Sequence, residues 1–347
     1  MRPKIRHLGC LLGLTALFQV NAWDYELHRL VNELALSSLP PSFPEFVRTP
    51  ETSERIAFLS GEPDRWRNSN EGALRHVNEP DHFFDVEDLE LLGLSLDRLP
   101  GFREEFVAQI AAARAKDPVR FPAVDPAKDS ARNRWIPGLL PWKLAEEYGR
   151  LKSDFSYLRT FEQHGGLPSE VANAQANIVY VMGVMGHFAG DAAQPLHTTK
   201  HYNGWVGANP SGYTTNRTIH SWIDGGFARA SGLDRAQVLS RVRPARLLWQ
   251  SSTNVPAEPA FPVALAFVRE QFQLVEALYA AEKEGKLKAD GPQADVGRKM
   301  IEDQVLKAGQ FLGDLWFSAW VQAPKDTFLQ SSLARRSLEK SGKTPKP

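Results

Sequence analysis

Three residues in the run HFAGDAAQPLH, namely His187, Asp191 and His197, have side chains that can bind a metal ion. His187 and Asp191 are four residues apart, so a helix would place them on one face, one turn from each other. Pro195 cannot continue a helix, so the chain turns there and can bring His197 back toward the same place. The run therefore predicts several ligands at one metal site.

A second pair, His220 and Asp224, repeats this spacing in HSWID, 33 residues after His187. Two H-x-x-x-D pairs and a further histidine are typical of the ligand set of a multinuclear metal site. Nitrogen and oxygen ligands without thiolate suit zinc best among the common metals, and manganese or iron less well.

The start of the chain predicts a secretory signal over residues 1–22. Arg2, Lys4 and Arg6 give a basic start, and the apolar stretch 8–18 is too short to span a membrane. Val20-Asn21-Ala22 then supplies small residues at the two positions that a signal peptidase needs. We expect a secreted or periplasmic protein; the alternative is a cytosolic protein with an apolar start.

Cys10, the one cysteine of the chain, lies inside this segment. The mature protein would therefore have no disulfide, no cysteine nucleophile and no thiolate ligand for zinc.

Cleavage after Ala22 would make Trp23 the first residue of the mature protein. A free α-amino group has a pKa near 8, so a metal ion can displace its proton near neutral pH. The amine and the carbonyl oxygen of Trp23 could then chelate one ion, and His28 is close enough in sequence to reach it. The alternative for His28 is a surface position on a helix.

Asp64 in GEPDRW and His82 in EPDHFFDVED are weaker ligand candidates. Aspartate is common in turns, and His76 competes with His82 for the role.

The elements that position these residues are expected to be helices. Apolar side chains recur at three and four residues over 102–110, 144–158, 265–279 and 305–316, and 168–190 has an almost continuous apolar middle. Convincing alternating strands are absent, so we predict an all-α fold.

Proline and glycine mark connections at 40–44, 118–138, 201–216 and 256–262. From 324 to 347 the chain is basic and poor in apolar residues. We expect a disordered tail there, after a single catalytic domain over 23–323. A solvated terminus is favoured over a weak nucleic-acid role for this tail.

The order of these motifs resembles the superfamily of zinc-dependent phospholipases C and zinc-dependent single-strand nucleases. The similar pattern runs from Trp23 to Asp224: a terminal Trp, His, Asp, His-Phe-x-Asp, then H-F-x-G-D-x-x-Q-P-L-H and H-x-x-x-D. The resemblance implies a compact helical bundle with three zinc ions at the bottom of a cleft.

The resemblance also implies a ligand set for each ion. The first ion would be bound by Asp64, His82, His187 and Asp191. The second would be bound by the amine and carbonyl of Trp23, by His28, and by Asp191 as a bridge. The third would be bound by His197, His220 and Asp224.

The chemistry expected of such a centre is phosphodiester hydrolysis. Two neighbouring ions lower the pKa of a shared water, giving hydroxide at neutral pH, and the third ion stabilises the leaving oxygen. Asp64 is also expected to orient the attacking water, which makes it the catalytic residue of the set.

Three features favour the nuclease branch over the phospholipase branch. The spacing from Trp23 to His28 is short, and the last pair ends in Asp224 rather than Glu. Phe83 and Asp85 match positions that in the nucleases stack on a base and hydrogen-bond its edge. The alternative for Phe83 is core packing. We expect single-stranded DNA or RNA as substrate, 3′-nucleotidase activity as a further property, and phospholipid as the alternative substrate.

The sequence also differs from the nucleases at features that bear on which substrate is bound. Disulfides are impossible, and a loop with Tyr202, Trp205 and Tyr213 replaces a Gly-Gly-Asn element. These aromatic residues could stack on bases or enter a lipid interface. Trp135 and Trp142 are expected to line the cleft. We expect a monomer without an obligate protein partner. Another alternative is a secreted protein that uses zinc only to hold its fold, although structural zinc sites are usually rich in cysteine.

Overall fold

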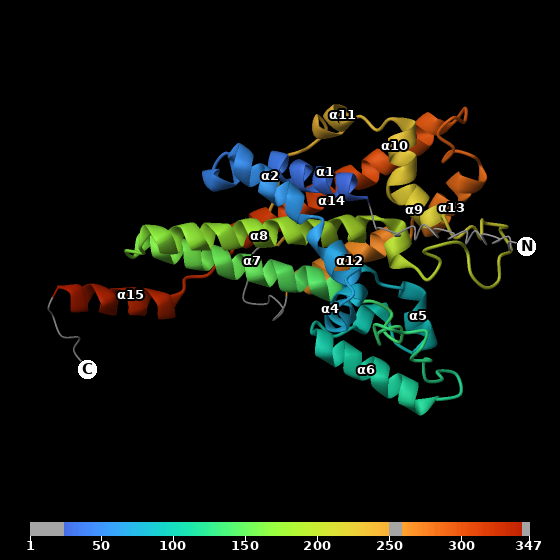
Figure 1. Ribbon diagram of the computed structural model, residues 1–347, viewed down its shortest axis with the longest axis horizontal. Coiled ribbons are helices and arrows are strands. Elements are labelled where there is room, and N and C mark those ends of the chain that lie inside the picture. The colour runs from blue at the N-terminus through green and yellow to red at the C-terminus, as the bar shows by residue number, and fades with distance from the viewer. Residues whose placement is uncertain (1–23, 250–258, 342–347) are drawn as a thin grey trace, which may run out of the picture.

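The computed structural model describes residues 24–249 and 259–341, which form helices joined by turns and loops (Figure 1). Within these ranges there is no β-strand, and β-type pairing is limited to two isolated bridges, Phe84 with Gly138 and Tyr202 with Gly204. The all-α prediction is confirmed. The expected signal segment 1–22 and the ligand Trp23 lie outside the described residues.

The α-helices are α1 (Tyr25–Ser38), α2 (Pro50–Leu59), α3 (Glu62–Arg67), α4 (Gly72–Asn78), α5 (Val86–Leu91), α6 (Arg103–Lys116), α7 (Leu140–Gln163), α8 (Pro168–Ala193), α9 (Ile219–Ser221), α10 (Phe227–Ser231), α11 (Arg235–Leu239), α12 (Ala260–Phe272), α13 (Val275–Lys283), α14 (Ala294–Val321) and α15 (Thr327–Lys340). The 3₁₀ turns are η1 (Glu45–Arg48), η2 (Glu79–His82), η3 (Leu96–Arg98) and η4 (Pro195–Thr198), and η5 (Trp222–Gly226) is a π-helical turn. Over the described ranges, no helix combines the length and the apolar character needed to cross a bilayer.

Helix α8 lies at the centre of the fold, packed against α7, α14, α2 and α1. Figure 1 shows α7 and α8 side by side along the long axis. Almost every residue of α8 from Ile178 to Ala193 is buried, as its apolar sequence predicts. Pro195 follows two residues after the helix ends and begins the η4 turn, because proline cannot continue an α-helix. The C-terminal part of α8 and η4 together therefore position His187, Asp191 and His197 in the interior.

Helix α1 is held against α8 and α14 by its buried side chains Leu27, Leu30, Val31 and Leu34. The side chain of Asp24 caps its first turn by accepting a hydrogen bond from the amide of Leu27 (3.2 Å). The helix starts next to the metal-ligand candidates, so His28 in its first turn points into the interior.

The apolar pattern over 265–279, which suggests one helix, belongs to two helices. Helix α12 ends at Phe272 and α13 begins at Val275, with Gln273 and Leu274 in the turn between them. The three- and four-residue spacing continues across this turn because both helices bury their apolar faces in the same core.

The expectation of a disordered tail from 324 differs from the structure. Helix α15 begins after Asp326, whose side chain accepts a hydrogen bond from the amide of Leu329 (2.8 Å). Leu333 is buried, and Arg336 makes two hydrogen bonds to Glu170 at 2.7 and 3.0 Å. The N-terminal cap, the buried leucine and the ion pair hold α15 in place, although the composition of this segment is that of a solvated tail. Residues 342–347 lie outside the described ranges.

Candidate metal centre

Three groups of imidazole and carboxylate side chains could each hold a metal ion. The first group is Asp64, His82 and His187; the second group is His28, His187 and Asp191; the third group is His197, His220 and Asp224. In each group the ligand atoms lie within 4.8 Å of one another, and all of these residues are buried except Asp64, which is partly exposed. The eight predicted ligands that the structure describes thus come together from helices α1, α3 and α8, from the turns η2, η4 and η5, and from α9.

Asp191 belongs to the second group and also lies next to His82 of the first group. Its Oδ2 is 3.0 Å from Nδ1 of His82 and 3.3 Å from Nε2 of His187, and its Oδ1 is 3.5 Å from Nε2 of His28. The side chain of Asp191 is fully buried. Both of its oxygens are therefore placed to bind cations on two sides, as a bridging carboxylate would.

Three histidines have the ring orientation of metal ligands. Nδ1 of His187 bonds to the carbonyl of Ser60 (2.7 Å), Nδ1 of His197 to that of His82 (2.6 Å), and Nδ1 of His220 to that of Tyr202 (3.1 Å). A carbonyl only accepts, so each Nδ1 carries a proton, and Nε2 is the nitrogen that would present a lone pair to a metal ion. Such a bond to a backbone carbonyl commonly fixes the tautomer of a metal-bound histidine.

Ring nitrogens of these histidines approach one another in two pairs. Nε2 of His187 lies 2.9 Å from Nδ1 of His82, and the two Nε2 atoms of His197 and His220 are 3.2 Å apart. These separations are near the roughly 3.4 Å expected for two nitrogen ligands on one tetrahedral ion. When both rings of a pair are neutral and their free nitrogens face the same point, a cation there could be bound by both.

Several buried polar atoms of the centre have no hydrogen-bond partner among the described residues. They include both ring nitrogens of His28, Nε2 of His82 and Oδ1 of Asp191. Buried polar atoms are rarely left unsatisfied in native proteins unless an ion or water completes them. The residues present therefore fit a metal centre with nitrogen and oxygen ligands.

The shifted pKa values of His28, His82 and Asp191 favour the protonation states that bind metal. Burial, and then the charge of Arg67, lower the pKa of His82 to about 3. Burial and then His187 lower the pKa of His28 well below its ordinary value. Burial alone would raise the pKa of Asp191, but the charges of His187 and His197 hold it well below its ordinary value. His28 and His82 are thus neutral imidazoles and Asp191 is an anion.

The third group depends on supports that the sequence did not reveal. Nε2 of Gln194 donates to Oδ1 of Asp224 (2.6 Å), which leaves Oδ2 facing Nε2 of His220 at 2.8 Å. Asp224 lies in the π-helical turn η5, and such turns often occur at functional sites. The backbone amide of Asp24 donates to the carbonyl of Asp224 (2.7 Å), so the residue that follows Trp23 in sequence is tied to the third group.

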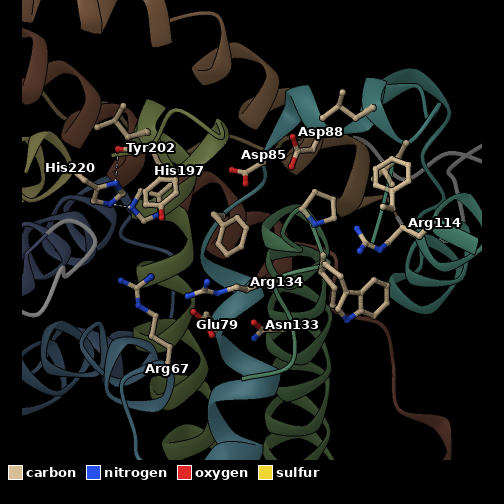
Figure 2. Close-up of a pocket in the computed structure, with 18 of the residues that line it drawn as sticks. Arg67, Glu79, Asp85, Asp88, Arg114, Asn133, Arg134, His197, Tyr202 and His220 are labelled. Atoms are coloured by element: carbon tan, nitrogen blue, oxygen red, sulfur yellow. Dashed lines mark hydrogen bonds between the residues drawn. The ribbon is translucent and has the colours of Figure 1, made fainter. Parts of the chain in front are cut away.

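A cleft of about 650 Å³ opens beside the third group. His197, His220 and Tyr202 line one side of it, and Figure 2 shows Asp85 and Asp88 on a neighbouring wall. Phe83 and Asp85 both line the cleft and are partly exposed, whereas Phe84 between them is fully buried in the core. Core packing is thus the role of Phe84, and Phe83 presents its ring to the cleft. Among the described residues no ring contact involves Phe83.

Desolvation in the cleft wall, and then the neighbouring Asp88, raise the pKa of Asp85 well above its ordinary value. The shift moves the carboxyl group toward its neutral form, which can both donate and accept a hydrogen bond.

Four arginines also line the cleft, and the sequence analysis did not single out any of them: Arg67, Arg114, Arg120 and Arg134. Arg67 is three residues after Asp64 on α3, and its Nε lies 2.9 Å from Oδ1 of that carboxylate. The other three belong to α6 and to the polar loop over 117–138 that follows it. The spacing of Asp64 and Arg67 was a usable signal, since side chains three apart on a helix are neighbours.

Of the other aromatic residues that the sequence suggested for the cleft, some line it and others are packed elsewhere. Trp135 lines the cleft, but Trp142 does not, because it is buried and stacks on Phe106 with ring centroids 4.2 Å apart. In the loop that follows η4, Tyr202 lines the cleft, while Trp205 stacks on His201 at 3.9 Å. Tyr213 packs against Trp205 and Tyr279. His76, the competitor of His82, binds the carbonyl of Ala131 through Nδ1 and is outside the three groups.

Comparisons with known proteins add no assignment: no family model matches the chain, and a search of curated proteins finds no match.

Proposed function

We propose that this protein is a zinc-dependent phosphodiesterase that cleaves single-stranded nucleic acid. Two observations support the proposal: the motif order from Trp23 to Asp224 resembles the zinc-dependent nucleases, and the predicted ligands that the structure describes gather in three groups. The arrangement includes one ligand role that the resemblance did not assign: His187 belongs to both the first and the second group. We further propose that the mature chain is secreted or periplasmic and works as a monomer, with Trp23 completing the second group.

Zinc is the proposed metal because each group offers only imidazole and carboxylate ligands. When bound, zinc supplies Lewis acidity for a water molecule and for the phosphoryl oxygens. Structural zinc sites are usually closed and rich in thiolate, whereas His197 and His220 of the third group line an open cleft. Access to these two histidines from the cleft supports a working site over a purely structural one.

The choice of nucleic acid rests on one observation, the lining of the cleft beside the third group. Aromatic rings of Phe83, Trp135 and Tyr202 line the cleft together with arginine side chains. Proteins bind unpaired strands in this way, since bases stack on aromatic rings and guanidinium groups attract the phosphates. In this proposal Phe83 stacks on a base and the carboxyl group of Asp85 hydrogen-bonds its edge.

Asp64 and Arg67 are the proposed catalytic pair. Burial raises the pKa of Asp64, but Arg67 and the neighbouring histidines lower it overall, so the carboxylate is ionised at neutral pH. As an anion it can accept a hydrogen bond from an attacking water and orient it. Arg67 fixes the carboxylate and also lines the cleft, where its charge can meet a phosphoryl oxygen.

Phospholipid remains the second candidate substrate because two large apolar side chains at the cleft are exposed: Leu91 at 40% and Tyr202 at 48%. Side chains of this kind could enter a lipid interface.

The experiment that tests the proposal uses the mature protein loaded with zinc. Release of acid-soluble nucleotides from single-stranded DNA or RNA is compared with release of phosphocholine from lecithin. We expect nucleotide release. Phosphocholine release without action on nucleic acid would reverse the choice, and activity on neither would overturn the assignment as a phosphodiesterase.

A further inference from the structure

The end of the cleft away from the third group has no role in the proposed chemistry. Figure 2 shows Arg114 on the opposite side of the cleft from His197 and His220, with Arg134 between them. This end is formed by the last turn of α6 and by the loop over 117–138.

Two guanidinium groups converge on one ring at this end. The guanidinium carbons of Arg114 and Arg120 lie 5.3 and 5.6 Å from the ring centroid of Phe121. Phe121 thus holds both charges in place through cation–π contacts. Arg114 also donates to the carbonyl of Pro122 (3.1 Å), which further limits its motion. Two long side chains that are already ordered lose less conformational entropy when they bind an anion.

Among the described residues these charges have no carboxylate partner. Arg114, Arg120 and Arg134 form no ion pair with a carboxylate of the described chain, in contrast to Arg67 or Arg103. The segment from Arg114 to Arg134 holds six basic and three acidic residues. The carboxyl groups that share the cleft are Glu79, Asp85 and Asp88, and burial is the largest cause of the raised pKa of both aspartates. The positive charge therefore dominates the far end.

We infer that the Arg114–Arg120 end of the cleft binds a backbone phosphate of the substrate strand, remote from the phosphate that is cleaved. Here the ligand class is a single-stranded polynucleotide longer than a dinucleotide, and the inference rests on the proposed function. Base stacking on Phe83 and Trp135 would bridge the interval between the two phosphates. The protein is then an enzyme that prefers long strands and acts on them with a strong dependence on salt.

The test compares the thymidine dinucleotide TpT with the twelve-residue strand dT12, on the zinc-loaded mature protein. The double variant Arg114→Gln/Arg120→Gln removes both charges and keeps polar side chains of similar reach. Lys116→Gln is the matched control, because Lys116 is an exposed cation on the same helix that does not line the cleft. Zinc content and thermal midpoint are measured for each protein.

We expect wild type to act on dT12 with a higher kcat/KM than on TpT. In the double variant kcat/KM for dT12 should fall about tenfold, as expected for two partly exposed charge contacts, and kcat/KM for TpT should change less than about twofold. The slope of log kcat/KM for dT12 against log salt should become shallower by about 0.7, the contribution of one phosphate contact on a single strand. Zinc content should not change, and the control should match wild type.

Equal efficiency of wild type on both substrates would overturn the inference and leave the proposed function standing. An equal loss on both substrates in the double variant, or no loss on dT12, would also overturn it. If wild type hydrolyses neither strand, the proposed function fails and the inference fails with it.

Discussion

Replacement of Gly186 by alanine should damage both the fold and the metal centre. Gly186 lies on α8 immediately before His187, where α1 crosses closely. A Cβ at this position would lie 1.6 Å from Oδ1 and 2.6 Å from Cγ of Asn32. Asn32 has no exposed surface, and its Nδ2 donates to the carbonyls of Ile56 (2.8 Å) and Gly183 (3.1 Å). It cannot move away without breaking these bonds.

The magnitude follows from those two bonds. A buried polar group left without its partner costs about 1–3 kcal/mol, and alanine is favoured over glycine in a helix by about 1 kcal/mol. At about 2 kcal/mol for each of the two bonds, less about 1 kcal/mol gained from alanine, the free energy of unfolding of Gly186→Ala should fall by about 3 kcal/mol. Zinc content should fall too, because His28 lies one turn before Asn32 and its ring stacks on His187 at 4.0 Å.

The assay is urea unfolding of the zinc-loaded protein, followed by circular dichroism, with zinc per chain measured on the same sample. Gly149→Ala is the matched control, since Gly149 lies within α7 and an added Cβ meets no atom within 4 Å. The control should be unchanged or more stable by up to about 1 kcal/mol. A Gly186→Ala protein as stable as the control and fully loaded with zinc would refute the reasoning.

Further predictions concern catalysis, the ligand supports, the chain start and pH. His197→Ala should abolish hydrolysis while circular dichroism stays that of the folded protein; retained turnover would contradict a catalytic third group. Gln194→Ala should weaken zinc binding about 10–100-fold, as for other residues that orient a ligand; an unchanged zinc affinity would show that Asp224 needs no such support. One extra residue before Trp23 should sharply reduce turnover, and a fully active extended form would exclude the terminal amine as a ligand. Burial, and then Glu147, raise the pKa of Asp154 to about 6, so stability falls as the pH rises from about 4, where the unfolded carboxyl ionises, and the loss is complete above about 6. Asp154→Asn should thus stabilise the protein at pH 8 by about 1 kcal/mol after allowance for solvent screening, and the gain should vanish near pH 4; urea midpoints that differ from wild type equally at both pH values would contradict this.

Local spacing made the central ligands predictable. A separation of four residues places His187 beside Asp191 on any helix, and Pro195 ends that helix wherever it packs. The same holds for the helical class, because the three- and four-residue apolar pattern depends only on helix geometry.

The remaining features depend on contacts between distant segments. The role of His187 in two groups follows from α1 bringing His28 against it, and its tautomer follows from the carbonyl of Ser60, 127 residues away. Trp142 is buried by the rings of Phe84, Phe106 and Phe261, which come from distant segments. Its local sequence does not indicate this burial. The order of α15 likewise depends on Glu170, which no local pattern could indicate.

The central position of α8 has a consequence for metal loading. One rigid rod carries His187 and Asp191, and the turn directly after it carries His197, so each of the three clusters takes a ligand from a single continuous stretch. A shift of that stretch by one ångström would spoil all three coordination spheres at once. Chelation should consequently strip the ions in one steep transition rather than in three separate steps, and partly loaded molecules should be scarce at equilibrium.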